Sequence, residues 1–185
     1  GDYAFYRCGD LTTITVPSGS IGEGCFSTCI SLTSATFGYY VTSIGENVLE
    51  SCISLKELYI FGGEILGYVG GGQKLKYLRI GSGVTSIGEM AFNGKGGLID
   101  VDIDEGLTTI GAYAFRECLN LPSIKIPNSV TRVGTRAFEN CVKLYGATIG
   151  NGLQSFGSVP FNQCNNLNTL TIACTTPPSI GNLGP

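Results

Sequence analysis

The 185-residue sequence predicts a solenoid, a stack of similar coils with a parallel β-sheet along one side. One phrase recurs: an aromatic or aliphatic anchor residue, a Cys three positions later, a Leu three beyond that, and an alternating strand. The anchors are spaced by 20 to 23 residues; they are Phe5, Phe26, Leu49, Val69, Phe92, Phe115, Phe138 and Phe161. A fixed period in this range is typical of stacked repeats and predicts about eight coils.

The coil from Ala114 to Arg136 illustrates each element in order. The segment Ala114–Cys118 is expected to form one short helical turn that places its Phe and Cys inside. Ile124–Ile126 alternates apolar and polar residues, as a half-buried strand does. Pro127–Ser129 then turns the chain, and Val130–Gly134 is expected to form a second extended piece on the opposite side. Each coil can bury its apolar residues only by stacking on its neighbours.

Stacking aligns equivalent residues in columns, and two inner columns are predicted to form the core. They are Leu11, Leu32, Leu55, Leu75, Leu98, Leu121, Leu144 and Leu167, and Ile14, Ala35, Leu58, Leu78, Val101, Ile124, Ala147 and Leu170.

The repeated phrase, such as A-F-R-E-C-L-N-L-P-S-I-K-I-P at Ala114 to Pro127, resembles the BspA-like leucine-rich-repeat family over nearly the whole chain. We therefore predict a right-handed β/α-type leucine-rich-repeat solenoid with about eight short parallel strands, mostly β and loops with short helical turns. The resemblance implies a secreted or surface-displayed protein associated with adhesion to host matrix proteins or to other cells. It supplies no catalytic residues. Ala173 to Gly181 also resembles the end of such arrays in secreted bacterial members.

Composition narrows the possible functions. The net charge is −3, from 11 basic and 14 acidic residues without a basic cluster, so nucleic acid is not an expected partner. No apolar stretch approaches the ~20 residues that cross a bilayer, and no signal-peptide pattern is visible. Because the chain begins in the middle of a repeat, we expect a single domain over residues 1–185 that is a fragment of a longer chain.

The eight cysteines are expected to be mainly buried, reduced thiols. Six of them share one column of the repeat: Cys8, Cys29, Cys52, Cys118, Cys141 and Cys164. A column of identical inward residues favours packing, since unpaired Cys is among the most buried residue types. Occasional disulfides remain an alternative. Metal binding is a weaker one, because the chain has no His and no C-x-x-C pair.

No enzyme machinery is visible, and we expect neither catalysis nor a cofactor. The absence of His removes the commonest general base and the usual triads. Asp100, Asp102 and Asp104 alternate along one strand, which favours a solvated acidic face over a weak Ca²⁺ site. Gly70–Lys74 lacks the spacing of a phosphate-binding loop and is expected to be a flexible turn.

The middle of the array is irregular. Coil three is three residues short, coil four opens with Tyr68–Gly72 and loses both the Phe and the Cys, and coil five has Lys95 at the Cys position. The outward strand positions are Thr, Ser and Gly at the ends of the array but larger and charged at its centre. The candidate ligand-binding residues are Glu57, Tyr59, Tyr77, Arg79, Asp100, Asp102 and Lys125. The leading hypothesis is a non-catalytic extracellular module that binds a protein or glycan; the alternative is a structural spacer that displays a neighbouring domain.

Overall fold

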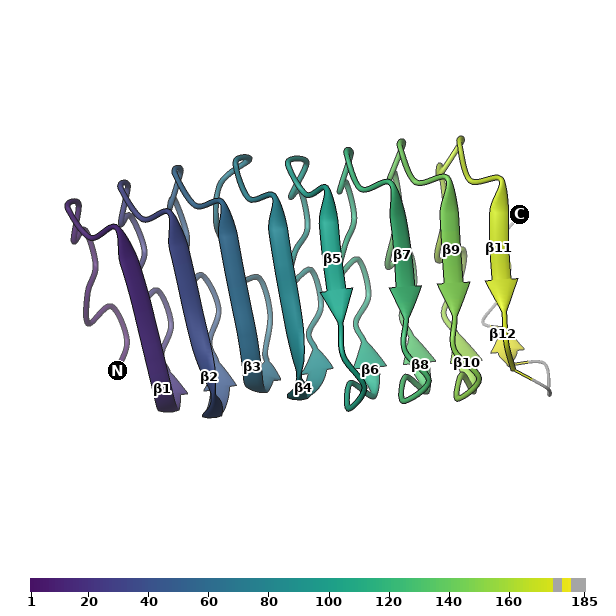
Figure 1. Ribbon diagram of the computed structural model, residues 1–185, viewed down its shortest axis with the longest axis horizontal. Helices are drawn as coiled ribbons and strands as arrows, with labels where there is room; N and C mark the ends of the chain where they lie inside the picture. Colours follow the sequence, from purple (N-terminus) through teal and green to yellow (C-terminus); the bar gives the residue numbers. More distant parts are fainter. Residues whose placement is uncertain (175–177, 181–185) are drawn as a thin grey trace.

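The chain folds as an elongated stack of about seven turns, shown in Figure 1, in a computed structural model that describes residues 1–174 and 178–180. The strands along the front of the stack are β1 (Thr13–Ile21), β2 (Ser34–Ile44), β3 (Glu57–Ile65), β4 (Tyr77–Ile87), β5 (Asp100–Ile103), β7 (Ser123–Ile126), β9 (Gly146–Ile149) and β11 (Thr169–Ile172). Shorter strands, β6 (Thr109–Ile110), β8 (Arg132–Val133), β10 (Ser155–Phe156) and β12 (Ser179–Ile180), line a second side. The leucine-rich-repeat solenoid and its parallel strands are confirmed.

The coils are of two kinds. In β1 to β4 one strand continues around the corner onto the second side, so that the lower end of β4 pairs with β6. Gly19 and Gly63 lie in these corners with φ of 88° and 92°, where a side chain would be strained. From β5 onward a turn separates the front strand from the short second strand, as the Pro127–Ser129 turn predicted.

The predicted short helical turns are wrong, because no residue is helical in the described part of the chain. In the anchor segment of one coil, Tyr113 and Glu117 have φ of 55° and 58°, which belongs to left-handed backbone. Their N–H groups and that of Phe115 donate to carbonyls of the next coil at 2.7 to 3.0 Å. These donors therefore serve the stack rather than a helix, and the anchor segments form a third hydrogen-bonded side. No helix in this part is long and apolar enough to cross a membrane.

The core is a set of columns that run along the stack. Phe92, Phe115 and Phe138 are fully buried, and successive rings stack with centroids 5.3 and 5.4 Å apart. The columns are uncovered at both ends, where Phe5 is 50% and Leu170 47% exposed. The predicted core is thus confirmed except in the terminal coils, which have a neighbouring coil on one side.

The front strands belong to two hydrogen-bonded ladders, not to the single sheet that the sequence predicts. β1 to β5 are joined in one sheet, which continues through the second side from β4 to β12. β7, β9 and β11 form a separate three-stranded ladder. The predicted array ending, Ala173 to Gly181, lies partly outside the described residues; within it, β12 pairs with β10.

Candidate binding surface at the centre of the strand face

The seven predicted ligand-binding residues lie on one face of β3, β4, β5 and β7, which we call the central strand face. Parallel pairing aligns Glu57, Tyr77 and Asp100 in one outward row. It aligns Tyr59, Arg79 and Asp102 in a second row two residues further along the strands. Alternation places all of these side chains outward, while Leu58, Leu78 and Val101 point into the core.

Arg79 is held in place by two carboxylates. Its guanidinium lies 2.9 Å from an Asp102 oxygen and 3.2 Å from Asp104. The three side chains are 44%, 56% and 33% exposed, so these pairs order the surface more than they stabilise the fold. Tyr59 is also fixed, since its hydroxyl donates to Glu57 at 3.3 Å. The sequence identified Arg79 as a candidate but did not predict its ion pairs with Asp102 and Asp104.

The central strand face is split between β5 and β7, because no ladder joins these two strands. Two prolines explain the split. In the preceding coil, Ile99 and Asp104 donate their N–H groups to carbonyls of the coil before them at 3.0 and 2.8 Å. Pro122 and Pro127 occupy the equivalent positions on either side of β7 and have no N–H to donate. The two bonds that would close the ends of the split are therefore missing.

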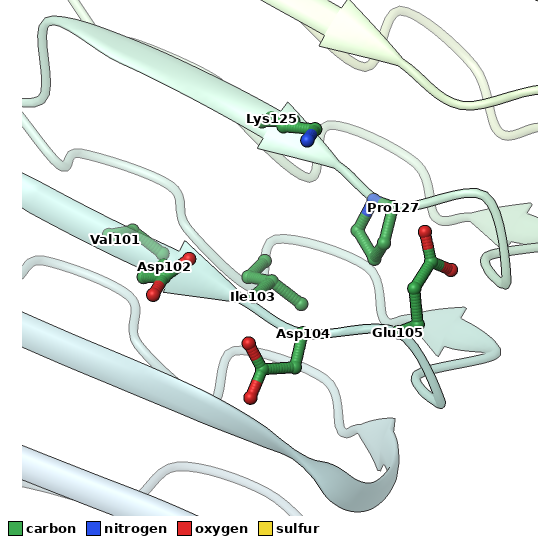
Figure 2. Close-up of a pocket in the computed structure, with 7 residues that line it drawn as sticks. All are labelled: Val101, Asp102, Ile103, Asp104, Glu105, Lys125 and Pro127. Atoms are coloured by element: carbon green, nitrogen blue, oxygen red, sulfur yellow. The ribbon is translucent and has the colours of Figure 1, made fainter.

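A polar depression of about 240 Å³ lies at the split. Asp102, Asp104 and Glu105 line it from the β5 side, and Lys125 and Pro127 from the β7 side, as Figure 2 shows. A second depression of about 180 Å³ adjoins it over β3 to β5, with Tyr59 and Tyr77 in its wall. Asp102 lines both. The structure therefore brings six of the seven predicted residues to two neighbouring depressions, with Glu57 beside Tyr59.

Sequence reasoning missed Glu105 and the two prolines. The Glu105 carboxylate accepts the backbone N–H groups of Asn128 and Ser129 at 3.1 and 2.8 Å. These bonds favour the charged form and lower the pKa of Glu105. The sequence shows that Pro122 and Pro127 flank a strand. Because proline has no N–H to donate to a ladder, these two residues could have predicted the split.

The three aspartates of β5 and the residue after it lie beside Arg79. No group of three or more potential metal-binding side chains was found among the described residues. Asp102 and Asp104 turn their carboxylates to Arg79 instead. Asp100 and Asp102 are exposed and Asp104 is partly exposed.

The cysteines of the repeat column are buried, except for the first one, which is exposed. Cys29, Cys52, Cys118 and Cys141 are fully buried, whereas Cys8 in the first coil is exposed. Interior thiols donate to the carbonyl of the Phe in the preceding coil, as Cys52 does to Phe26 at 3.2 Å. Burial raises the pKa of Cys52 to about 12. All eight cysteines are free, so the buried-thiol prediction holds apart from the exposed Cys8 and the partly exposed Cys174.

Lys95 replaces a cysteine of that column and is itself buried, with 2% of its surface exposed. Its ammonium donates to the Tyr68 hydroxyl at 2.7 Å and to the Gly71 carbonyl at 3.1 Å. Coil four, which lacks both Phe and Cys, thus supplies the partners that satisfy the lysine. Burial lowers the pKa of Lys95 to about 8, against an opposing effect of Glu50.

Comparison with known proteins agrees with this architecture. The fold and its columns define a leucine-rich-repeat protein. A model described as "BspA type Leucine rich repeat region" matches in six copies over residues 1–66 and 64–182, so the chain belongs to this family. No curated protein matches the sequence.

Several solved bacterial structures are similar to the chain. A leucine-rich repeat protein from Bacteroides ovatus is 26% identical with a TM-score of 0.61, over 88% of this chain and 49% of that one. A leucine rich cell surface protein from Faecalibacterium prausnitzii is 22% identical with a TM-score of 0.53, over 91% and 62%. A T. pallidum leucine rich repeat protein is 22% identical with a TM-score of 0.63, over 91% and 72%. The chain thus spans about half to three-fifths of the length of the first two.

Proposed function

We propose that the chain is a non-catalytic recognition module of a secreted or cell-surface protein, and that its central strand face binds a protein or glycan in adhesion. One observation carries the proposal. The outward rows are small and repetitive at the ends, but the centre presents a contiguous group of Tyr, Arg, Asp and Lys around two depressions. A spacer needs no such concentration, whereas binding surfaces are enriched in Tyr and Arg.

The surface location is supported by the family and by the F. prausnitzii relative, which is described as a cell surface protein. Host extracellular matrix proteins are therefore ligands to test first, together with glycans. The mixed signs of Arg79, Lys125 and the aspartates favour a polar ligand over a strongly charged polymer.

The test is a binding screen followed by a triple substitution. The purified chain is screened against matrix proteins and glycans, and Tyr59, Tyr77 and Arg79 are then replaced together by Ala. Each truncation of a central contact is expected to cost about 1 kcal/mol or more of binding free energy, so the triple variant should bind at least about 100-fold more weakly. A variant with Thr15, Thr36 and Thr148 replaced by Ala is the matched control, since these residues share the row of Tyr59.

Thermal unfolding of both variants confirms that they are folded. Parental affinity in a folded Tyr59, Tyr77 and Arg79 variant would place the site elsewhere. The absence of any ligand in the screen would favour the spacer.

A further inference from the structure

We propose that the two depressions are adjacent subsites for a neutral oligosaccharide, with one sugar ring at the split and the next against the tyrosines. This inference rests on the proposed function and narrows its ligand. The observation behind it is the interrupted ladder between β5 and β7, which removes the usual partners of backbone groups on both walls.

The backbone at the split supplies both donors and acceptors. The pairing of β4 with β5 shows which groups meet in an intact ladder: the N–H of each outward residue donates to a carbonyl of the preceding coil. By this pattern the N–H groups of Ser123 and Lys125 would donate to the carbonyls of Ile99 and Val101. Among the described residues Ser123 makes no such bond to Ile99, and no ladder joins β5 to β7, so backbone groups along the split are open to other partners.

The side chains around the split show the same complementarity. Asp102 and Asp104 line one wall of the depression and Lys125 lines the other, as Figure 2 shows. Both carboxylates also contact Arg79 on the β4 side, and that of Asp104 points away from Lys125. A sugar hydroxyl donates one hydrogen bond and accepts others, so vicinal hydroxyls can bridge such walls. Arg79 fixes Asp102 from the opposite side and offsets part of the acidic charge, which favours a neutral ligand. Pro127 and Ile103 add apolar contacts for the C–H groups of a ring.

The second subsite is an aromatic one. Tyr59 and Tyr77 come from neighbouring strands, and Tyr77 is 43% exposed. Tyrosine offers a flat apolar ring against which the C–H face of a pyranose can pack, together with a hydroxyl for hydrogen bonding. At about 180 and 240 Å³, each depression is smaller than a drug-sized pocket and suits a single ring. Asp102 lines both, as expected for a residue at a glycosidic junction.

Other ligands fit the split less well. An extended peptide inserted between the two ladders would need strand spacing of about 4.8 Å on each side, whereas β6 and β8 of the same two coils pair directly with each other on the second side. A divalent cation would need several free carboxylates, but two of the three at the split are paired with Arg79. A polyanion would be repelled by the carboxylates of Asp102 and Asp104.

The first experiment measures binding of neutral trisaccharides of glucose, galactose, mannose and N-acetylglucosamine by NMR titration of the purified chain. At least one trisaccharide is expected to bind and to perturb the amides of Asp102, Ser123 and Lys125. Asp102→Asn and Tyr77→Ala are each expected to weaken binding about tenfold or more, since each removes a major contact of one subsite. Thr148→Ala, in the same row as Asp102, is the control and should leave affinity unchanged.

The second experiment restores the missing donors. Pro122→Ala combined with Pro127→Ala returns two N–H groups to the ends of the split and should let β7 join β5. The amides of Ser123 and Lys125 are then expected to exchange more slowly with solvent, and trisaccharide affinity is expected to fall at least about tenfold. If the split had only a structural role, slower amide exchange would not be accompanied by weaker trisaccharide binding. Slower exchange with unchanged affinity would overturn the assignment of the split.

The outcomes separate the two proposals. A protein ligand that is lost on Tyr59, Tyr77 and Arg79 substitution, without any trisaccharide binding, would overturn the sugar site and leave the proposed function standing. Binding of neither a protein nor a glycan would overturn both. Trisaccharide binding that the Asp102 and Tyr77 variants retain would also overturn the site.

Discussion

At the scale of single residues, equivalent positions in the repeat take very different roles according to their coil. The cysteine position holds a buried thiol in most coils, an exposed one at Cys8 and a buried ammonium at Lys95. The sequence located all three in one column but could not predict that Lys95 stays inside. That depends on Tyr68, whose hydroxyl reaches it from the preceding coil.

The buried ammonium predicts a pH-dependent stability. The pKa of Lys95 is about 8 when folded and 10.5 as an ordinary lysine, so the unfolded chain binds more protons between these values. Stability therefore rises with pH in this window, relative to a variant without the amine. The difference in unfolding free energy between parent and Lys95→Met is expected to shift in favour of the parent by up to about 1.4 kcal/mol per pH unit, and to be flat below pH 8.

Denaturant unfolding of both proteins from pH 7 to 10.5 measures this shift. The buried thiols are common to both, so their titration largely cancels in the difference. A difference that stays constant across the window would show that Lys95 is not buried as described.

The phenylalanine column predicts a strong dependence on position. Phe115 is fully buried between two stacked rings, so Phe115→Ala is expected to cost about 3–5 kcal/mol of unfolding free energy. Phe5 is 50% exposed and stacks on one ring, so Phe5→Ala should cost clearly less. Denaturant unfolding compares the two; a loss below about 1 kcal/mol at Phe115 would contradict its place in the core.

At the scale of strands and turns, apolar alternation predicted the front strands because it reports directly which side chains face the core. It could not predict the anchor segments, where non-glycine residues such as Tyr113 and Glu117 adopt positive φ. Tertiary hydrogen bonds to the next coil impose that backbone, and local propensity does not reveal them. The split at β7 was readable from Pro122 and Pro127, but only after the register of the coils was known.

The thiol column predicts graded reactivity along the stack. Cys8 is exposed and should react quickly with a thiol reagent in the folded protein. Cys52 should react only after denaturation, because burial excludes the reagent and raises its pKa to about 12. Cys29, Cys118 and Cys141 are also buried and should behave in the same way. Mass spectrometry of labelled peptides checks this order, and early labelling of the interior cysteines or four disulfides would refute it.

At the scale of the whole molecule, the period alone predicted the solenoid, since stacking follows from repetition; the structure has about seven turns where about eight coils were predicted. The candidate site was predicted as a set of residues that break the repetition at the centre. The shape of the site could not be predicted. The two depressions and the ion pairs of Arg79 depend on how the residues of β3, β4, β5 and β7 lie beside one another.

Stability is expected to vary along the stack. Coils at both ends have a neighbour on one side, and Phe5, Leu170 and Ile172 are exposed there. Native-state hydrogen exchange should therefore be fastest in β1 and β11 and slowest in the fully enclosed coils around β4. Uniform protection across all coils would contradict this description of the core.

We propose that the ligand lies on the central strand face. The most direct measurement is an amide NMR map of the chain with and without the ligand found by screening. We predict that perturbed amides cluster in β3, β4, β5 and β7, at and beside Tyr59, Tyr77, Arg79 and Asp102. Perturbations confined to the second side (β6, β8 and β10) or to the terminal strands β1 and β11 would contradict it.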